Sequence, residues 1–290
     1  MRKQILKGYL LVIGAALIWS LTGLIIRSAV ASTLWGTTIR SLTAAVVLFP
    51  VMRKYKVKID KNVILTGIIY VIFVGAFIVT TKIGTSAMAV SMQSAAPLYI
   101  IIFEFIKKRK IIKSKLPTFI FIGTGVSLSI IDALKSANAA SILFGFIIGA
   151  GFLAYSAILR KINTHSALGL IGAINIVAFF CNLAILPFDF YPIPSSAGTI
   201  IAFVFAGIFI SALSYAMYGT SIRLIGVETA MIIALIEPVL NPVWVYLGTG
   251  VAPSVMAIIG LALILGGVIV NTFSEGKSET GEADDLQLEK

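Results

Sequence analysis

The sequence predicts an all-α membrane protein of ten transmembrane helices, arranged as two inverted five-helix repeats. Of the 290 residues, 59% are hydrophobic and only 12% are charged, whereas soluble proteins carry about 25% charged residues. Ten apolar runs of near-spanning length follow one another, and Lys and Arg gather in alternate connections between them. A water-soluble fold of this length could not bury so much apolar surface. Lipid must therefore be the solvent for much of the chain.

The apolar runs define the expected helices. Each is close to the roughly 20 residues that cross about 30 Å of hydrocarbon as an α-helix. The first run follows Arg2, Lys3 and Lys7 and is longer than the apolar core of a signal peptide, so we interpret it as a retained helix. The runs are residues 8–27, 34–52, 62–81, 86–106, 115–131, 139–159, 166–187, 197–218, 228–247 and 253–272.

The distribution of basic residues predicts the orientation. With a cytoplasmic N-terminus, 19 of the 23 Lys and Arg residues lie on the cytoplasmic side and 3 on the outer side, while Arg40 lies within the second helix. Because cytoplasmic loops carry the excess of basic residues, we expect a multi-pass protein of the cell membrane with both termini cytoplasmic. These loops also account for the net charge of +11, and no nucleic-acid partner is expected. The acidic segment 274–290 is predicted to be a disordered cytoplasmic tail.

Two halves are indicated by residues that recur at similar spacing. Pro97 and Pro238 are 141 positions apart, and the same offset pairs Lys82 with Arg223. The sequence thus predicts one repeat over residues 1–135 and a second over 136–273. Since five crossings is an odd number, the second repeat enters from the opposite side of the membrane, and a pseudo-two-fold axis in the membrane plane relates the two.

Four short motifs carry a family resemblance. They are Trp19-Ser20, Arg40-Ser41, Glu237-Pro238-Val239 and the glycine-rich run 259–268. Over about residues 8–272 the chain resembles the EamA-type permeases of the drug/metabolite transporter superfamily. The resemblance implies a ten-helix, inverted-repeat transporter around a central cavity. An acidic residue that the family often has near the ends of helices 4 and 9 is absent here, so its role is not carried over.

Glu237 is the strongest candidate for a functional group. It lies about eight residues, or roughly 12 Å, from the inner end of its helix, too deep for its short side chain to reach water. Pro238 removes a backbone donor and kinks the helix there, as Pro97 does in the fourth helix. We expect Glu237 to recognise substrate or to carry a coupling proton. The alternative is a static role as a buried partner of Arg40 or of the backbone.

Arg40 has two interpretations of equal standing. It lies about six residues, roughly 9 Å, inside the outer end of the second helix. Its long side chain could extend to the outer interface. It could instead face the cavity and pair with a carboxylate of the substrate or of the protein.

Further polar and aromatic residues complete the expected substrate pathway. Gln93 and Asn241 flank the two prolines, and their amide groups suit hydrogen bonds either to a ligand or to neighbouring helices. Trp19 and Tyr155 are candidates to stack on a substrate, and Trp19 lies deep in the first helix instead of in an aromatic belt. Asn175 in the seventh helix is a weaker candidate of the same kind.

The sequence argues against an enzyme. His165 is the only histidine and Cys181 the only cysteine, so no metal site of the usual His/Cys type and no cofactor are expected. The predicted function is a secondary active or facilitative transporter, an exporter of an amino acid, drug-like compound or other metabolite by alternating access. Protons are a candidate coupling ion, and the protein would act in the lipid bilayer as a monomer or homodimer. The alternative is a lipid-linked flippase or scramblase.

Overall fold

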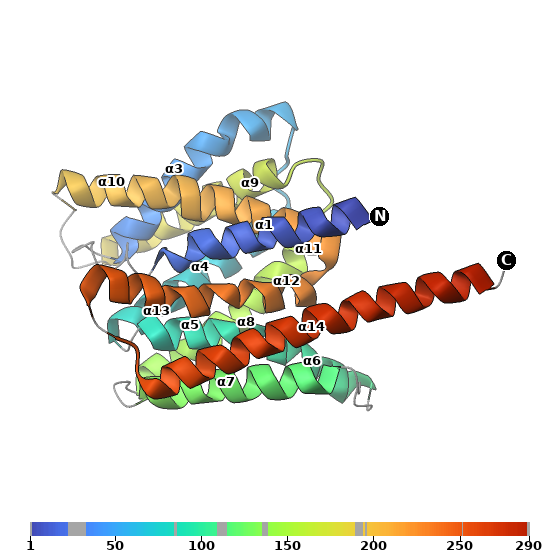
Figure 1. The fold of residues 1–290 in the computed structure, drawn as a ribbon. Helices are drawn as coiled ribbons and strands as arrows, with labels where there is room; N and C mark the ends of the chain where they lie inside the picture. Colours follow the sequence, from blue (N-terminus) through green and yellow to red (C-terminus); the bar gives the residue numbers. More distant parts are fainter. Residues whose placement is uncertain are drawn as a thin grey trace.

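The computed structural model describes residues 2–22, 33–83, 86–108, 115–134, 139–188, 194, 196–250 and 252–288. Helix occurs at every one of the ten predicted positions (Figure 1). The first half contains α1 (Arg2–Ser20), α3 (Thr33–Lys54), α4 (Lys61–Ile83), α5 (Ser86–Ser94), α6 (Ala96–Lys108) and α7 (Leu116–Leu134). The second contains α8 (Ala139–Lys161), α9 (Ala167–Ile185), the 3-10 turn η2 (Leu186–Phe188), α10 (Ala197–Ala206), the π-helix η3 (Gly207–Ser214), α11 (Tyr215–Ile225), α12 (Val227–Ala234), α13 (Ile236–Thr249) and α14 (Val255–Leu288).

Length and composition make most of these helices fit to cross a membrane. Six described segments are long and apolar enough: Leu34–Lys54, Lys61–Thr81, Ala140–Lys161, Ala167–Phe188, Ala197–Ile225 and Val227–Gly248. Met88–Phe103, Leu116–Asp132 and Val255–Asn271 are shorter apolar helices. Residues 23–27 of the first predicted run lie outside the described residues, and α1 begins earlier than expected, at Arg2.

Two of the predicted helices are broken at matching places. The fourth is interrupted at Ala95, between α5 and α6, and the ninth at Leu235, between α12 and α13. A proline follows each break, at Pro97 and Pro238. A proline has no N–H for the carbonyl four residues earlier and its ring crowds that carbonyl. The last bonds before each break tighten accordingly: Ala95 N–H donates to Met92 O at 3.3 Å, and Leu235 N–H to Ile232 O at 3.1 Å.

The eighth predicted helix changes its winding midway. It starts as α10, widens into the π-helix η3 and returns to α-helix in α11. A π-helix forms i→i+5 bonds, is rare and is frequently found at functional sites. The wider turn sets the angular position of Ser211 and of the α11 side chains that follow it.

The packing pattern is nearly unchanged when the two halves are exchanged. α3 packs along α9 and α7 along α14, so each of these helices meets its own counterpart. α4 packs on α8, and the corresponding pair with the halves exchanged is α11 on α1. α4 also packs on α9, and its corresponding pair is η3 on α3. Matching glycines allow the close approaches. A Cβ added at Gly67 would lie 2.6 Å from Val177, and one added at Gly207 would lie 2.6 Å from Thr43.

The ends of the chain lie on the same side of the helical assembly, where α1 begins and α14 ends (Figure 1). α14 is helical as far as Leu288 and so runs through most of the segment 274–290, for which a disordered cytoplasmic tail stays a prediction. Extending an existing helix adds one hydrogen bond per residue without a new nucleus. Glu, Lys, Ala and Leu, which recur in this segment, also have high helix propensity.

Candidate functional site

A small cavity lies in the interior of the assembly, beside both helix breaks. Its volume is about 40 Å³. It is lined by Trp19, Thr22, Arg40, Phe73, Val74, Phe77, Ile78, Gln93, Ile210, Tyr215 and Glu237. These residues come from both halves of the chain. The cavity therefore lies where the two halves meet, and it gathers four of the candidate residues: Glu237, Arg40, Gln93 and Trp19.

The break in the ninth helix positions Glu237. It is the second residue of α13 and is buried, with 5% of its surface exposed. Gln93, one residue before the end of α5, donates a hydrogen bond from Nε2 to Glu237 Oε2 at 3.2 Å. Each partner thus sits next to one of the two breaks. The matched prolines bring a carboxyl group and an amide group together across the halves.

Arg40 faces the interior. It is buried on α3, and its Nε donates to Ser211 Oγ of η3 at 3.3 Å. It lines the central cavity and also a second hollow of about 10 Å³, which is bordered by Thr37, Ser41, Tyr70, Val71, Val74, Asn182 and Ser211. The structure therefore favours the inward interpretation of Arg40 over extension to the outer interface.

Arg40 and Glu237 line the same cavity without forming a salt bridge. Within the described part of the chain, no salt bridge joins Arg40 to Glu237, and each is held by a neutral partner instead. Tyr215 lies on the wall of the same cavity. A static salt bridge to Arg40, one of the two static roles weighed for Glu237, is therefore absent from the described residues.

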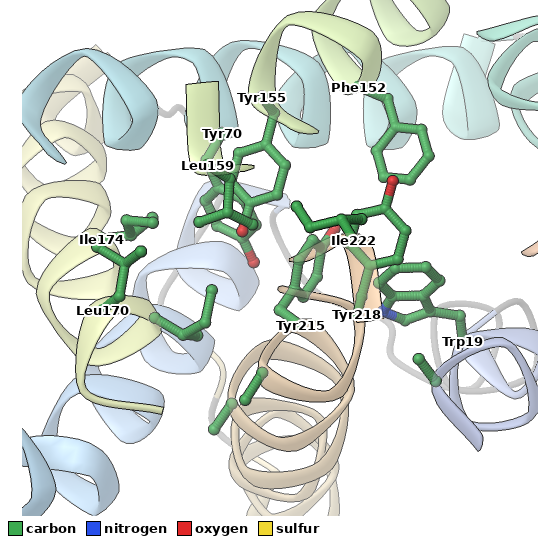
Figure 2. Packing of buried hydrophobic residues seen from close by; sticks show 14 of the residues in the cluster. Trp19, Tyr70, Phe152, Tyr155, Leu159, Leu170, Ile174, Tyr215, Tyr218 and Ile222 are labelled. Carbon is green, nitrogen blue, oxygen red and sulfur yellow. The ribbon is translucent and has the colours of Figure 1, made fainter. Parts of the chain in front are cut away.

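A cluster of aromatic rings packs together in the buried core (Figure 2), and three of its members, Trp19, Phe73 and Tyr215, line the cavity. Its members are Trp19 on α1, Tyr70 and Phe73 on α4, Phe152 and Tyr155 on α8, and Tyr215 and Tyr218 on α11. The ring centroids of Trp19 and Tyr215 are 5.0 Å apart, and those of Tyr70 and Tyr215 are 5.1 Å apart. These are contact distances for edge-to-face packing. Trp19 and Tyr155 therefore belong to one cluster, but only Trp19 also lines the cavity.

Sequence reasoning missed most of this cluster. Tyr70, Phe73, Phe152, Tyr215 and Tyr218 are apolar enough to pass for ordinary membrane-helix residues. One signal was available. On each of α4, α8 and α11 two aromatic residues stand three positions apart, which places both on one helix face.

Several buried polar atoms in this region lack a hydrogen-bond partner among the described residues. They include Trp19 Nε1, the Tyr155 hydroxyl and Asn175 Oδ1. An unpaired buried polar atom costs about 1–3 kcal/mol. Trp19 Nε1 belongs to a cavity-lining side chain, so a solute or water in the cavity is the natural partner for it.

The remaining two candidates lie in contacts between helices. Asn241 Nδ2 on α13 donates to the carbonyl of Ser20 at 3.3 Å, and Trp244 Nε1 donates to Ser20 Oγ at 2.8 Å. Asn175 Nδ2 on α9 donates to Ile171 O at 2.9 Å and to Ser211 O at 3.5 Å. Neither asparagine lines the central cavity. Asn241 joins α13 to α1, two helices that contribute to the cavity wall, and Asn175 joins α9 to η3 through the carbonyl of the same Ser211 that binds Arg40.

The cavity is lined by one acid, one amide, one guanidinium and several aromatic rings. Among the described residues, no group of three or more His, Cys, Asp or Glu is placed to hold a metal ion.

Comparisons with known proteins agree with this architecture. The model of the EamA-like transporter family matches the chain twice, over residues 6–131 and 135–273. A solved structure described only as "Crystal structure of protein" is 18% identical and superimposes with a TM-score of 0.73, covering 92% of this chain and 97% of that chain. At that identity the likeness is one of fold. No curated protein matches the sequence significantly.

Proposed function

The chain belongs to the EamA-like transporter family of the drug/metabolite transporter superfamily, and we propose that it moves a small organic solute across the membrane by alternating access. Members of this family are multi-pass membrane transporters and not typically enzymes. The finer proposal is a secondary active or facilitative transporter that exports an amino acid, a drug-like compound or another metabolite.

The observation that carries this proposal is the central cavity between two broken helices. Transporters of inverted-repeat architecture bind substrate near the bilayer midplane, where discontinuous helices meet. Here the cavity lies beside the breaks at Ala95 and Leu235 and contains Arg40, Gln93 and Glu237. Charged residues at membrane depth are costly and usually mark a substrate or ion pathway.

Ten crossings in two inverted repeats complete the proposal. The double family match supports two repeats, and so does the packing pattern that survives exchange of the halves. Inverted repeats give two similar conformations open to opposite sides, which alternating access requires. The 19-to-3 distribution of basic residues supports cytoplasmic termini. Glu237 is the group on which a coupling proton would travel.

A lipid-linked flippase or scramblase is the second candidate. An apolar groove of about 360 Å³ runs between α13 and α14, bordered by Val239, Pro242, Val243, Tyr246, Pro253, Ile258, Leu261, Ala262 and Leu265. A moving lipid headgroup needs polar partners along its path. The groove supplies almost none and shares no residue with the cavity. This separation supports a solute over a lipid as the cargo.

Transport by reconstituted protein tests the proposal. Full-length protein in proteoliposomes should carry at least one class of labelled amino acid, drug-like cation or metabolite, and Glu237→Gln should slow that flux at least tenfold. Tenfold corresponds to about 1.4 kcal/mol, less than the loss expected for one buried charged contact. Asp132→Asn is the matched control, because Asp132 bonds Ser254 outside the cavity. The role of Glu237 is wrong if both variants transport equally well.

A lipid-flipping assay in the same vesicles separates the two candidates. We expect fluorescent lipids to equilibrate no faster than in protein-free vesicles. Rapid flipping with no flux of any solute would instead establish the lipid function.

A further inference from the structure

The second hollow, which shares Arg40 with the central cavity, is lined mainly by buried polar side chains. Its volume is about 10 Å³, and it lies between α3, α4, α9 and η3. Its polar lining residues expose between 1% and 8% of their surface. They are Thr37, Arg40, Ser41, Tyr70, Asn182 and Ser211. A buried polar side chain is costly unless it has a partner, so this grouping needs a physical explanation.

Arg40 brings a positive charge to this hollow, and its other described lining residues are neutral. A guanidinium stays protonated in proteins and donates hydrogen bonds without accepting any. Its Nε donates to Ser211 Oγ at 3.3 Å. Within the described part of the chain, its Nη groups have no hydrogen-bond partner, and Arg40 forms no salt bridge. A charge removed from water in this way is costly without a counter-charge.

The neighbours of Arg40 supply further donors around the same space. The side chains of Ser41 and Asn182 have no hydrogen-bond partner among the residues that the structure describes. Ser211 Oγ accepts from Arg40 and can still donate its own hydrogen. Tyr70, also on the lining, carries another hydroxyl group. A guanidinium, three hydroxyl groups and an amide are thus available to donate to one acceptor, and hydrogen bonds to a charged acceptor are the strongest kind.

We propose that this hollow binds one chloride ion, held by the guanidinium of Arg40 and by the hydroxyl and amide donors around it. A space of about 10 Å³ is at the lower limit for one water molecule, so the ligand is about one atom in size. Carboxylate, phosphate and sulfate groups are too large. Water fits but brings no counter-charge. Chloride supplies one and is the abundant single-atom anion; it is somewhat larger than water, so the surrounding side chains must move slightly outward.

The ion also affects the neighbouring cavity. Because Arg40 lines both spaces, a chloride ion in the hollow reduces the positive charge that Arg40 presents to the central cavity. The ion is a fixed part of the protein and is not the transported solute. The chloride site is therefore independent of the proposed transport function.

Thermal unfolding of the purified full-length protein tests the proposal. The protein is exchanged into sodium gluconate and titrated with sodium chloride or sodium bromide at constant ionic strength. A ligand that binds only the native state stabilises it, so the melting temperature should rise with either halide and level off when the site is full. In crystals grown with bromide, an anomalous scattering peak should lie between Arg40, Ser41 and Asn182.

Variants assign the effect to this hollow. Arg40→Gln should abolish the response of the melting temperature to chloride. Ser41→Ala, which removes one donor and leaves the charge, should weaken the apparent affinity for chloride about tenfold. Ser214→Ala is the control, because Ser214 is buried on the same π-helix as Ser211 but lines neither space, and it should respond as the wild type does. If Arg40→Gln does not fold, Ser41→Ala and the bromide peak still decide.

The proposal is overturned if chloride and gluconate stabilise the protein equally, if Ser41→Ala keeps the wild-type affinity, or if no bromide peak lies in the hollow. A water molecule would then account for the polar lining. Flux in the proteoliposomes is a separate measurement. Loss of the chloride site with flux intact would leave the transport function standing, whereas saturable chloride binding without flux of any solute would remove the function and keep the site.

Discussion

Single polar residues at membrane depth organise the candidate site, and Ser211 is the one that most directly supports a charge. Its hydroxyl accepts from Arg40 Nε at 3.3 Å, and its carbonyl accepts from Asn175 Nδ2. It lies on the π-helix η3, so the altered winding of that segment decides whether it reaches Arg40. The side chain of Arg40 is thus positioned by a residue whose role depends on local backbone geometry.

Removing the Ser211 hydroxyl should therefore destabilise the protein. A hydrogen bond to a charged group is worth about 1.5–3 kcal/mol, and at 3.3 Å the lower figure applies. We expect Ser211→Ala to lower the free energy of unfolding by about 1.5 kcal/mol, measured by titration of the detergent-solubilised protein with SDS. Ser214→Ala is the control, because Ser214 Oγ donates to Ile210 O within the same helix. Equal losses in the two variants would argue against a supporting role for Ser211.

At this scale the sequence predicts charged residues better than the partners that hold them. Glu237, Gln93 and Arg40 could be singled out because polar groups in hydrocarbon are costly. Ser211 could not, because serine is common in membrane helices and bonds its own backbone readily. Asn241 and Asn175 can also be singled out for their polarity, but neither lines the cavity. Their polarity is explained by contacts between helices, the more common use of such residues.

At the scale of the helices, the close pair α7 and α14 depends on glycine. A Cβ added at Gly125 would lie 2.5 Å from the carbonyl oxygen of Gly260 and 2.9 Å from Ile264 N. These are backbone atoms, which cannot move aside as a flexible side chain can. The two helices therefore approach as closely as they do only because Gly125 has no side chain.

A single methyl group should separate these helices. We expect Gly125→Ala to destabilise the protein by about 1–3 kcal/mol through overpacking, measured by the same SDS titration. Gly123, two residues away on α7, has no atom within 4 Å of an added Cβ. Gly123→Ala should leave stability unchanged or raise it by up to about 1 kcal/mol through helix propensity. A loss at Gly123 as large as that at Gly125 would contradict the packing argument.

Helix positions follow from hydropathy, but their internal irregularities do so only in part. The breaks at Ala95 and Leu235 can be anticipated because Pro97 and Pro238 have an identifiable backbone effect. The π-helix η3 cannot, because Gly207 to Ser214 contains no proline and its winding depends on packing against α3. Gly207 approaches Thr43 and the Arg40 carbonyl on that helix, so tertiary contact decides the local geometry.

At the scale of the whole molecule, an ion pair joins the two halves at one end. Lys115 Nζ, at the start of α7, lies 2.5 Å from Glu228 Oε2 in the first turn of α12. Nearby, Arg223 donates from Nη1 to Thr164 O at 3.3 Å and from Nη2 to Ile162 O at 3.2 Å. The turn between α11 and α12 is thereby tied to both α7 and the α8–α9 connection. In the proposed orientation this is the cytoplasmic end, so separation of the halves on that side would have to break these contacts.

Breaking the Lys115–Glu228 pair should favour the conformation that is open at this end. In a Cys181→Ala background with Thr22→Cys as a reporter in the cavity wall, we expect Glu228→Lys to raise the rate of maleimide labelling from the cytoplasmic side several-fold. Like charges at this distance repel, whereas the native pair, with side chains 28% and 18% exposed, is only partly screened by solvent. The rate of labelling from the outer side should fall at the same time, because the conformation open to the cytoplasm becomes more populated at the expense of the conformation open to the outside.

A double variant in which the two residues are exchanged tests whether the contact between Lys115 and Glu228, or only the charge of one of them, affects the rate of labelling. Lys115→Glu combined with Glu228→Lys restores the attraction with the same two residue types, so labelling should return toward the wild-type rate. Restoration would mean that the contact between the halves, and not either charge alone, sets the balance of conformations. If the double variant labels as fast as Glu228→Lys, or if labelling from both sides rises together, the pair does not control access. The inverted-repeat mechanism would then have to depend on other contacts between the halves.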